Sequence, residues 1–233
     1  MGLIETCDDG VVRTLDPAYY TSDAIYQQEC AGLFMRTWQY AGHVSQAPNP
    51  GDYFTFEIAG QQLFCIRDDQ GKLNTFYNVC QHRAHELVQG SGNCRKLIVC
   101  PYHAWSYHLD GQFFKGPNTD SVPGFSGEAI SLSKVRTEVF CSFVFVNLDD
   151  AAAPMEAWYP AAEQELHAYV PDIDSLEPLE WTQVLEKCNW KVSVENYSEC
   201  YHCRINHKTF ATGVIKPETY DIQPQGYCLR HTT

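Results

Sequence analysis

Long hydrophobic runs and basic residues are both scarce in this sequence of 233 residues. No apolar stretch approaches the ~20 residues that a helix needs to cross a membrane, so we expect no membrane span. Lysine and arginine number 16 against 29 aspartates and glutamates, which gives a formal net charge of −13. Such an acidic chain would be repelled by a phosphate backbone, so we expect no nucleic-acid partner.

A disulfide framework is also missing, although cysteine itself is not rare. The 11 cysteines are an odd number, and their spacing follows no pattern of paired bridges. The N-terminal region is acidic and lacks the apolar segment of a signal peptide. Together these features predict a reducing, cytoplasmic location.

Four residues in two short clips stand out against this background. Cys80 and His82 form a C-x-H clip, and Cys100 and His103 form a C-x-x-H clip. A [2Fe–2S] centre of the Rieske type needs this donor set, because two thiolates hold one iron and two imidazoles hold the other. Each clip supplies one cysteine and one histidine, so we expect two loops to hold one cluster between them.

A structural zinc site is the alternative for the same four residues, since zinc is also held by two cysteines and two histidines. Zinc fingers normally pair like with like, cysteine with cysteine and histidine with histidine. Both clips here are mixed, which favours the iron–sulfur centre. A zinc-stabilised interaction protein stays open as a further hypothesis; visible absorption separates the two, because the cluster is coloured and zinc is not.

The residues around both clips resemble those of a known family. CQHRAHEL (80–87) and CPYHAWSYHLDG (100–111) are similar to the two cluster loops of the Rieske non-haem iron oxygenases. The resemblance implies a chain of the α-subunit type, whose cluster receives electrons from NAD(P)H through a flavin or iron–sulfur reductase. Tyr102 and Trp105, which lie in the second loop, are expected to shield the cluster from water.

Short strands separated by turns predict the fold of the first two thirds of the chain. The expected strands are 53–58, 62–67, 73–79, 97–99 and 104–109, with one buried β run over 139–146. They indicate a small antiparallel β domain over 38–148. An arm and a helix are predicted over 1–37, the helical pattern running from 22 to 38.

The remaining residues, 149–233, read as a mixture of helices and strands. We expect a linker over 149–154, helices over 155–169 and 189–203, and strands over 181–186 and 219–230. The predicted fold class is therefore α+β. By resemblance, the antiparallel β Rieske domain is followed by the beginning of a helix-grip catalytic domain, which is expected to be incomplete here.

Glu199, His202 and His207 form a second constellation, E-x2-H-x4-H. Mononuclear non-haem iron sites use two histidines and a carboxylate on one face of the metal, which leaves positions for O2 and substrate. Glu199 and His202 share one face of a regular helix, whereas His202 and His207 point about 140° apart. The two histidines can hold one metal only if the helix ends or bulges between them.

The residues of this segment also have interpretations that do not involve an iron site. Cys200 and Cys203 could be half of a zinc or redox site, but no second C-x-x-C completes it. The two histidines of the constellation could be ordinary surface residues. Four further histidines have no partner pattern and are read as structural: His43, His108, His167 and His231.

The segment NWKVSVENYSECYHCRINH (189–207) resembles the catalytic motif of the same oxygenase family. This implies that His202 and His207 bind mononuclear Fe(II), and that Glu199 bridges them to His103 of a neighbouring subunit in a head-to-tail homotrimer. The family's third iron ligand is a late carboxylate, which the resemblance puts beyond Thr233.

The substrate class follows from details of the same motifs. Many ring-hydroxylating members have aspartate as the bridging acid, whereas this chain has Glu199. Glutamate there, with Y-H-C after it and HRAHEL near the cluster, resembles the branch that oxidises choline, glycine betaine, carnitine and proline betaine. We therefore expect O2-dependent hydroxylation and N-demethylation of a quaternary ammonium compound. An aromatic-ring-hydroxylating α subunit and a Rieske electron carrier without oxygenase activity are the alternatives.

Overall fold

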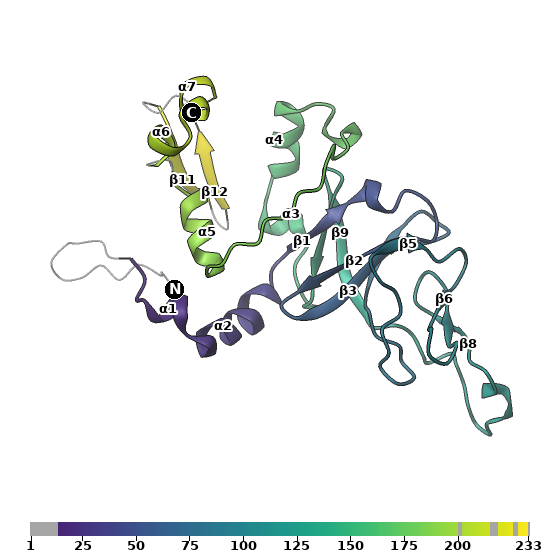
Figure 1. The fold of residues 1–233 in the computed structure, drawn as a ribbon. Coiled ribbons are helices and arrows are strands. Elements are labelled where there is room, and N and C mark those ends of the chain that lie inside the picture. Colours follow the sequence, from purple (N-terminus) through teal and green to yellow (C-terminus); the bar gives the residue numbers. More distant parts are fainter. Residues whose placement is uncertain (1–13, 200–201, 215–218, 226–227, 233) are drawn as a thin grey trace. The chain divides into compact units, whose positions relative to one another are not determined.

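The computed structural model describes residues 14–199, 202–214, 219–225 and 228–232 (Figure 1). The chain forms two compact units. The larger unit is Cys30–Glu180, and the smaller unit joins Met1–Glu29 with Trp181–Thr233. These limits follow contacts within each unit, and the domain boundaries at 37 and 148 stay predictions.

The larger unit is built on a seven-stranded sheet in the order β1-β10-β9-β4-β3-β2-β5. Its strands are β1 (Gln39–His43), β2 (Asp52–Ile58), β3 (Gln61–Arg67), β4 (Leu73–Tyr77), β5 (Ser91–Asn93), β9 (Lys134–Phe140) and β10 (Phe143–Asn147). A second sheet contains β6 (Ile98–Val99), β7 (Ser106–Tyr107) and β8 (Phe113–Lys115). All neighbouring strands pair antiparallel, which confirms the predicted antiparallel β domain.

The turn between β3 and β4 shows how one side chain specifies a hairpin. Asp68 Oδ1 accepts hydrogen bonds from the N–H groups of Gln70 at 3.0 Å and Lys72 at 2.9 Å. Its Oδ2 accepts one from Asn74 Nδ2 at 2.8 Å. Gly71 has a φ of 83°, a conformation that costs glycine little and other residues more. Aspartate and glycine are typical of such a turn, because the aspartate side chain accepts from nearby backbone N–H groups and glycine tolerates a positive φ.

β9 and β10 form a second hairpin, whose turn residues are Cys141 and Ser142. Their φ angles are 49° and 65°, as a two-residue hairpin turn requires. The single β run predicted over 139–146 is therefore wrong, because the chain reverses in its middle and Phe140 pairs with Phe143. The turn escapes prediction because neither glycine nor asparagine, the usual residues at such positions, stands there.

One hydrophobic cluster supports the loops that carry the four clip residues. It joins side chains of the large sheet to side chains of the small sheet and contains both clip cysteines. Its buried members are Phe64, Ile66, Phe76, Cys80, Leu87, Ile98, Cys100, Tyr107, Leu109, Phe113 and Leu132. Close-packed interiors resist movement, so both loops rest on a rigid base.

The segment that follows the large sheet is helical but interrupted. α3 (Met155–Trp158) and α4 (Ala162–Tyr169) replace the single helix predicted over 155–169. Pro160 stands between them, and a proline disrupts a helix because it lacks an N–H and clashes with the preceding turn. A short 3-10 turn, η4 (Ile173–Ser175), completes this part of the larger unit.

The smaller unit consists of helices and one hairpin (Figure 1). Its elements are α1 (Ala18–Thr21), α2 (Asp23–Glu29), α5 (Trp190–Tyr197), α6 (Cys203–Asn206), α7 (Lys208–Gly213), β11 (Asp221–Gln225) and β12 (Cys228–Thr232). β11 and β12 pair antiparallel, in place of the single strand predicted over 219–230. No helix in the described part of the chain is long and apolar enough to cross a membrane.

A carboxylate joins α2 to α5 inside the smaller unit. Glu29 accepts a hydrogen bond from Lys191 Nζ at 2.5 Å and another from Trp190 Nε1 at 2.9 Å. The side chains of Lys191 and Glu29 are only 9% and 15% exposed. Because a nearly buried charge needs a partner, this pair fixes the N-terminal helices against α5.

Two predicted elements of this region are wrong. The helix predicted over 22–38 ends at Glu29 and continues only as a π-helical turn, Cys30–Phe34. The strand predicted over 181–186 is irregular chain, and Val184 and Leu185 within it are 75% and 86% exposed. An apolar segment forms a strand only where a neighbouring strand pairs with it. Among the described residues, no strand pairs with 181–186.

We expect Asn78→Ala to destabilise the larger unit by roughly 2–4 kcal/mol. Asn78 is 2% exposed, and its Oδ1 accepts from the N–H groups of Leu87 at 3.0 Å and Val88 at 3.1 Å. Its Nδ2 donates to the Val88 carbonyl at 2.7 Å. Removing the amide leaves these backbone groups buried without partners. Urea unfolding measures the change. Gln70→Ala, at an exposed turn position, is the control, and an equal effect in both variants would contradict the argument.

Candidate metal centres

The two loops that carry the clips share one backbone conformation. In the first loop, the N–H of Cys80 donates to the carbonyl five residues later at 2.9 Å, and its carbonyl accepts from the N–H four residues later at 3.0 Å. The second loop repeats both bonds around Cys100, at 2.8 Å and 3.0 Å. In each loop the fourth residue after the cysteine, Ala84 or Ala104, has a φ of 56°. The two clips are therefore held in the same way.

The structure brings the four predicted ligands together. Cys80 and Cys100 are each 2% exposed and lie at the base of the loops. The rings of His82 and His103 lie nearer the surface, with centroids 4.8 Å apart and planes 80° apart. Two buried thiols in the same loops as two convergent imidazoles fit the donor set of a Rieske [2Fe–2S] cluster.

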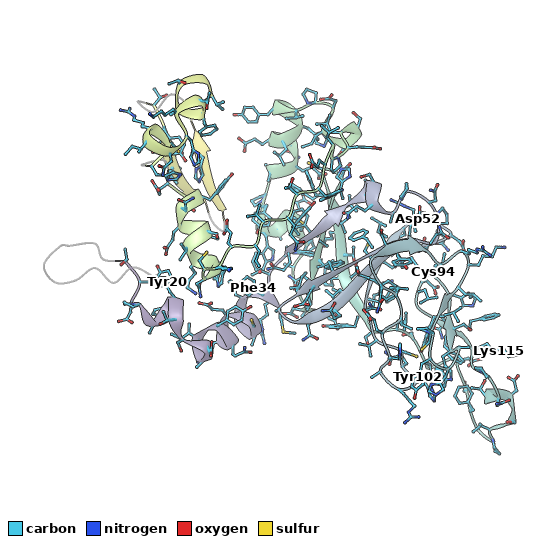
Figure 2. The ribbon with its side chains drawn as sticks, in the orientation of Figure 1. Tyr20, Phe34, Asp52, Cys94, Tyr102 and Lys115 are labelled. Carbon is cyan, nitrogen blue, oxygen red and sulfur yellow. The ribbon has the colours of Figure 1, made fainter. Side chains whose placement is uncertain are left out.

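Aromatic side chains support both imidazoles. Trp105 stacks on His82 with centroids 4.7 Å apart and planes 14° apart. Tyr102 lies against His103 with centroids 3.8 Å apart, and it is 56% exposed. Figure 2 shows Tyr102 at the loops, away from the strands of the large sheet. The contacts agree with the expectation that Tyr102 and Trp105 cover the cluster residues.

Tyr107 is a further candidate residue that the motif analysis missed. Its ring is fully buried, and its hydroxyl lies 3.2 Å from Cys80 Sγ and accepts a hydrogen bond from the N–H of Gln81 at 3.1 Å. Because the hydroxyl oxygen is the acceptor in the bond with Gln81, its own proton can be donated to the sulfur of Cys80. The sequence offered only a weak signal: in a strand over 104–109, as predicted, Tyr107 would share a face with Trp105.

Local electrostatics favour neutral imidazoles, whereas the thiolates depend on a bound metal for their stability. Burial, followed by the positive charges of His82, Arg83 and His85, lowers the pKa of His103. Its neutral form, which is the ligand form, therefore persists to lower pH. Burial raises the pKa of the Cys80 thiol, although the hydrogen bond with Tyr107 opposes this. A buried thiol of this kind ionises when a metal binds it.

The second constellation lies where the helix breaks. α5 ends at Tyr197, so the helix predicted over 189–203 is too long and Glu199 lies outside it. His202 precedes α6, and His207 separates α6 from α7 with φ −121° and ψ 57°. The rings of His202 and His207 have centroids 5.2 Å apart. The expectation that the helix must end between the two histidines is confirmed.

Glu199 orients the first of these histidines. Its Oε1 lies 2.5 Å from Nδ1 of His202, so the carboxylate accepts the Nδ1–H and leaves Nε2 for a metal. Within the described part of the chain, no third histidine, cysteine or acidic ligand atom lies close to both His202 and His207. The residues present therefore fit two of the three positions of a facial triad.

Two tyrosines to which the sequence motifs did not point, Tyr197 and Tyr220, contact His231, the histidine read as structural. The Tyr220 hydroxyl forms a hydrogen bond with Nδ1 of His231, and the Tyr197 ring lies 5.8 Å from the His231 ring. Burial, then Tyr197 and then the charge of Glu199, raise the pKa of Tyr220. The nearby Cys203 is disulfide-bonded, whereas the other cysteines whose side chains the structure describes are free.

Two family models match the chain. Residues 37–126 match the model of the Rieske [2Fe-2S] domain. Residues 155–227 match the model of the ring hydroxylating alpha subunit, catalytic domain. The first match contains both clips, and the second contains the E-x2-H-x4-H constellation.

Curated relatives agree with these models. The oxygenase subunit of carnitine monooxygenase from Acinetobacter pittii (strain PHEA-2) is 35% identical over 221 residues, which are 95% of this chain and 60% of that protein. The glycine betaine monooxygenase oxygenase subunit of Chromohalobacter salexigens is 31% identical over 90% of this chain and 46% of its own length. Choline monooxygenase of Spinacia oleracea is 31% identical over 91% and 48%. The chain spans 60% or less of the length of these relatives.

Solved structures give the same result. The quaternary ammonium Rieske monooxygenase CntA, in complex with L-carnitine, superposes with a TM-score of 0.83 and 35% identity, over 90% of this chain and 59% of that one. Naphthalene 1,2-dioxygenase with indole in its active site gives a TM-score of 0.70 and 28% identity, over 83% and 44%. The chain therefore combines a Rieske [2Fe–2S] domain with residues of a ring-hydroxylating α-subunit catalytic domain, and the relatives and solved structures that it is similar to are Rieske oxygenases.

Proposed function

We propose that this chain belongs to the oxygenase component of a monooxygenase that hydroxylates a small quaternary ammonium compound. The observation that supports this most directly is the convergence of the four clip residues in a chain that also brings His202 and His207 together. The substrate class rests on the relatives, which are named as carnitine, glycine betaine and choline monooxygenases. Hydroxylation of an N-methyl group would release formaldehyde and leave a demethylated amine.

In this proposal the four clip residues hold the [2Fe–2S] cluster. Cys80 and Cys100 bind from the buried base of the loops, and His82 and His103 bind nearer the surface. The bound cluster supplies one-electron redox chemistry. Trp105 excludes water from one face of His82 by stacking on it.

His202 and His207 are proposed to hold mononuclear Fe(II), which supplies the activation of O2 when bound. Glu199 fixes the orientation of His202 and the nitrogen that faces the metal. The third ligand is proposed to be a late carboxylate beyond Thr233, as the family pattern implies. The pair of histidines supports this role over that of a simple electron carrier, because a carrier has no use for a second metal site.

The assembly is part of the same proposal. A flavin or iron–sulfur reductase is proposed to deliver electrons from NAD(P)H, in the cytoplasm. Each cluster would serve the iron site of the next subunit in a head-to-tail homotrimer, since a heterologous interface of this kind can close into a ring. Glu199 would then lie between His202 and the partner subunit's His103. Its side chain is 43% exposed, which leaves the carboxylate accessible.

The substrate class is tested with the complete oxygenase and an NAD(P)H-dependent reductase. We expect O2 uptake and formaldehyde release to be faster with carnitine, glycine betaine or choline than with benzoate. Oxygen electrode traces and formaldehyde assays give both quantities. Turnover of benzoate with none of the three ammonium compounds would assign the protein to the aromatic-ring-hydroxylating alternative.

Tyr107→Phe should lower the reduction potential of the cluster by roughly 20–60 mV. The hydroxyl donates to Cys80 Sγ, and such a bond stabilises the more negative, reduced cluster. A hydrogen bond is worth about 0.5–1.5 kcal/mol, and a one-electron couple moves by about 59 mV for 1.4 kcal/mol. An EPR-monitored redox titration measures the shift. Tyr102→Phe, which removes a hydroxyl from an exposed ring, is the control, and an unchanged potential in Tyr107→Phe would rule out the hydrogen bond to the sulfur.

Glu199→Gln should weaken Fe(II) binding at His202 and His207 about 10–100-fold, because the amide holds the His202 ring less firmly than a carboxylate does. The visible spectrum of the cluster should not change. In single turnover of the complete oxygenase, reoxidation of the reduced cluster should become slow. Iron analysis after dialysis and stopped-flow absorbance measure these effects.

The matched control for Glu199 is Glu180→Gln, at an exposed position of the larger unit. It should keep the wild-type iron content and the wild-type rate of reoxidation. If Glu199→Gln also keeps both, Glu199 neither orients His202 nor contributes to electron transfer.

A further inference from the structure

Three potential ligands meet in the larger unit at a place unrelated to either iron site. The ligand atoms of Cys141, Glu163 and His167 all lie within 4.8 Å of one another. Cys141 is 2% exposed, whereas Glu163 is exposed and His167 is half-buried. Of the described residues, this is the one group of three or more cysteine, histidine and acidic side chains with such mutual distances.

Two elements far apart in the sequence supply these residues. Cys141 is at the tip of the β9–β10 hairpin, while Glu163 and His167 both come from α4. Residues four apart on a helix lie on one face, one turn apart, so Glu163 and His167 point the same way. This i, i+4 spacing is one by which a helix can offer two ligands to a single metal.

A fourth candidate ligand comes from η4. Asp174 Oδ2 lies 3.4 Å from Nε2 of His167. The Ser142 hydroxyl donates to the backbone carbonyl of Asp174 at 3.1 Å, so the hairpin tip contacts η4 as well as α4. A carboxylate beside an imidazole either orients the ring or takes a coordination position itself.

The charges around the group are negative, and no lysine or arginine of the described residues pairs with them. Among the described residues, Glu163 forms no ion pair with a basic side chain, and Asp174 pairs only with His167. Burial, then Glu163 and then Asp174, raise the pKa of Cys141. A divalent cation would balance this charge.

We propose that Cys141, Glu163, His167 and Asp174 bind a divalent transition metal of the Zn²⁺ type. A thiolate and an imidazole select zinc over magnesium or calcium, which prefer oxygen ligands only. Binding would form the Zn–S bond with release of the Cys141 proton to solvent. The metal would join the tip of the β9–β10 hairpin to α4 and fasten the helical segment to the sheet.

Cobalt is the probe, because Co²⁺ substitutes for zinc and gives a near-ultraviolet charge-transfer band only when a thiolate binds it. The chain is used with its [2Fe–2S] cluster loaded, so Cys80 and Cys100 are not available to the added metal. A Co²⁺ ion at His202 and His207 would have no sulfur ligand and no such band. A thiolate band in the difference spectra therefore cannot come from either iron site.

We expect a thiolate band that saturates at one Co²⁺ per chain and is displaced by Zn²⁺. Cys141→Ser and His167→Gln should abolish it, and Glu163→Gln, a conservative change at an exposed position, should weaken binding. Zn²⁺ should raise the melting temperature of the wild type and not that of Cys141→Ser. Cys188→Ser, which removes an exposed thiol of the other unit, and Glu165→Gln, on the same helix, are controls that should behave as wild type.

The proposal fails if the wild type shows no thiolate band with excess Co²⁺. It fails equally if the band survives in Cys141→Ser or disappears in Cys188→Ser, because the sulfur ligand would then be another cysteine. None of these outcomes depends on oxygenase activity, so the result does not rest on the proposed reaction.

Discussion

The backbone hydrogen bonds that close the two cysteine loops are the interactions on which the candidate cluster site depends. Each clip cysteine pairs its own N–H and C=O inside its loop, so the thiol is buried without leaving backbone polar groups unsatisfied. The closure needs a left-handed residue, which Ala84 and Ala104 supply at some energetic cost. The buried Asn78 amide forms hydrogen bonds with the backbone of Leu87 and Val88, at the end of the first loop. This rigid base lets two histidine rings converge nearer the surface.

The second site depends on the opposite feature, an interruption of regular structure. A continuous helix would direct His202 and His207 about 140° apart. The break at His207, with its non-helical backbone, brings the rings within 5.2 Å. Glu199 lies outside any helix and reaches Nδ1 of His202. The chain therefore gives up regular helix hydrogen bonds at this point, and the two histidine rings approach each other as they could not on a regular helix.

The larger unit does more than carry the cluster loops. The hairpin tip at Cys141 and Ser142 contacts α4 and η4, which lie in the segment after the sheet. Glu138 on β9 accepts a hydrogen bond from the N–H of Met155 at 2.9 Å. The helical segment that follows the predicted linker is therefore attached to the sheet through side chains, and a bound metal would strengthen that attachment.

The sequence by itself determined which donor atoms the two candidate metal sites offer. The mixed clips at 80–82 and 100–103 and the constellation at 199–207 identify donor atoms, and donor type follows from side-chain chemistry alone. It also determined the antiparallel β domain, because hydrophobic alternation and turn residues are local signals.

Only the tertiary structure decided where the elements end and which distant residues meet. The reversal at Cys141, the end of α5 at Tyr197 and the contact of Tyr107 with Cys80 carry no strong local signal. Each depends on packing between segments far apart in the chain, and the energy of such packing exceeds the small local propensities that a sequence pattern reports.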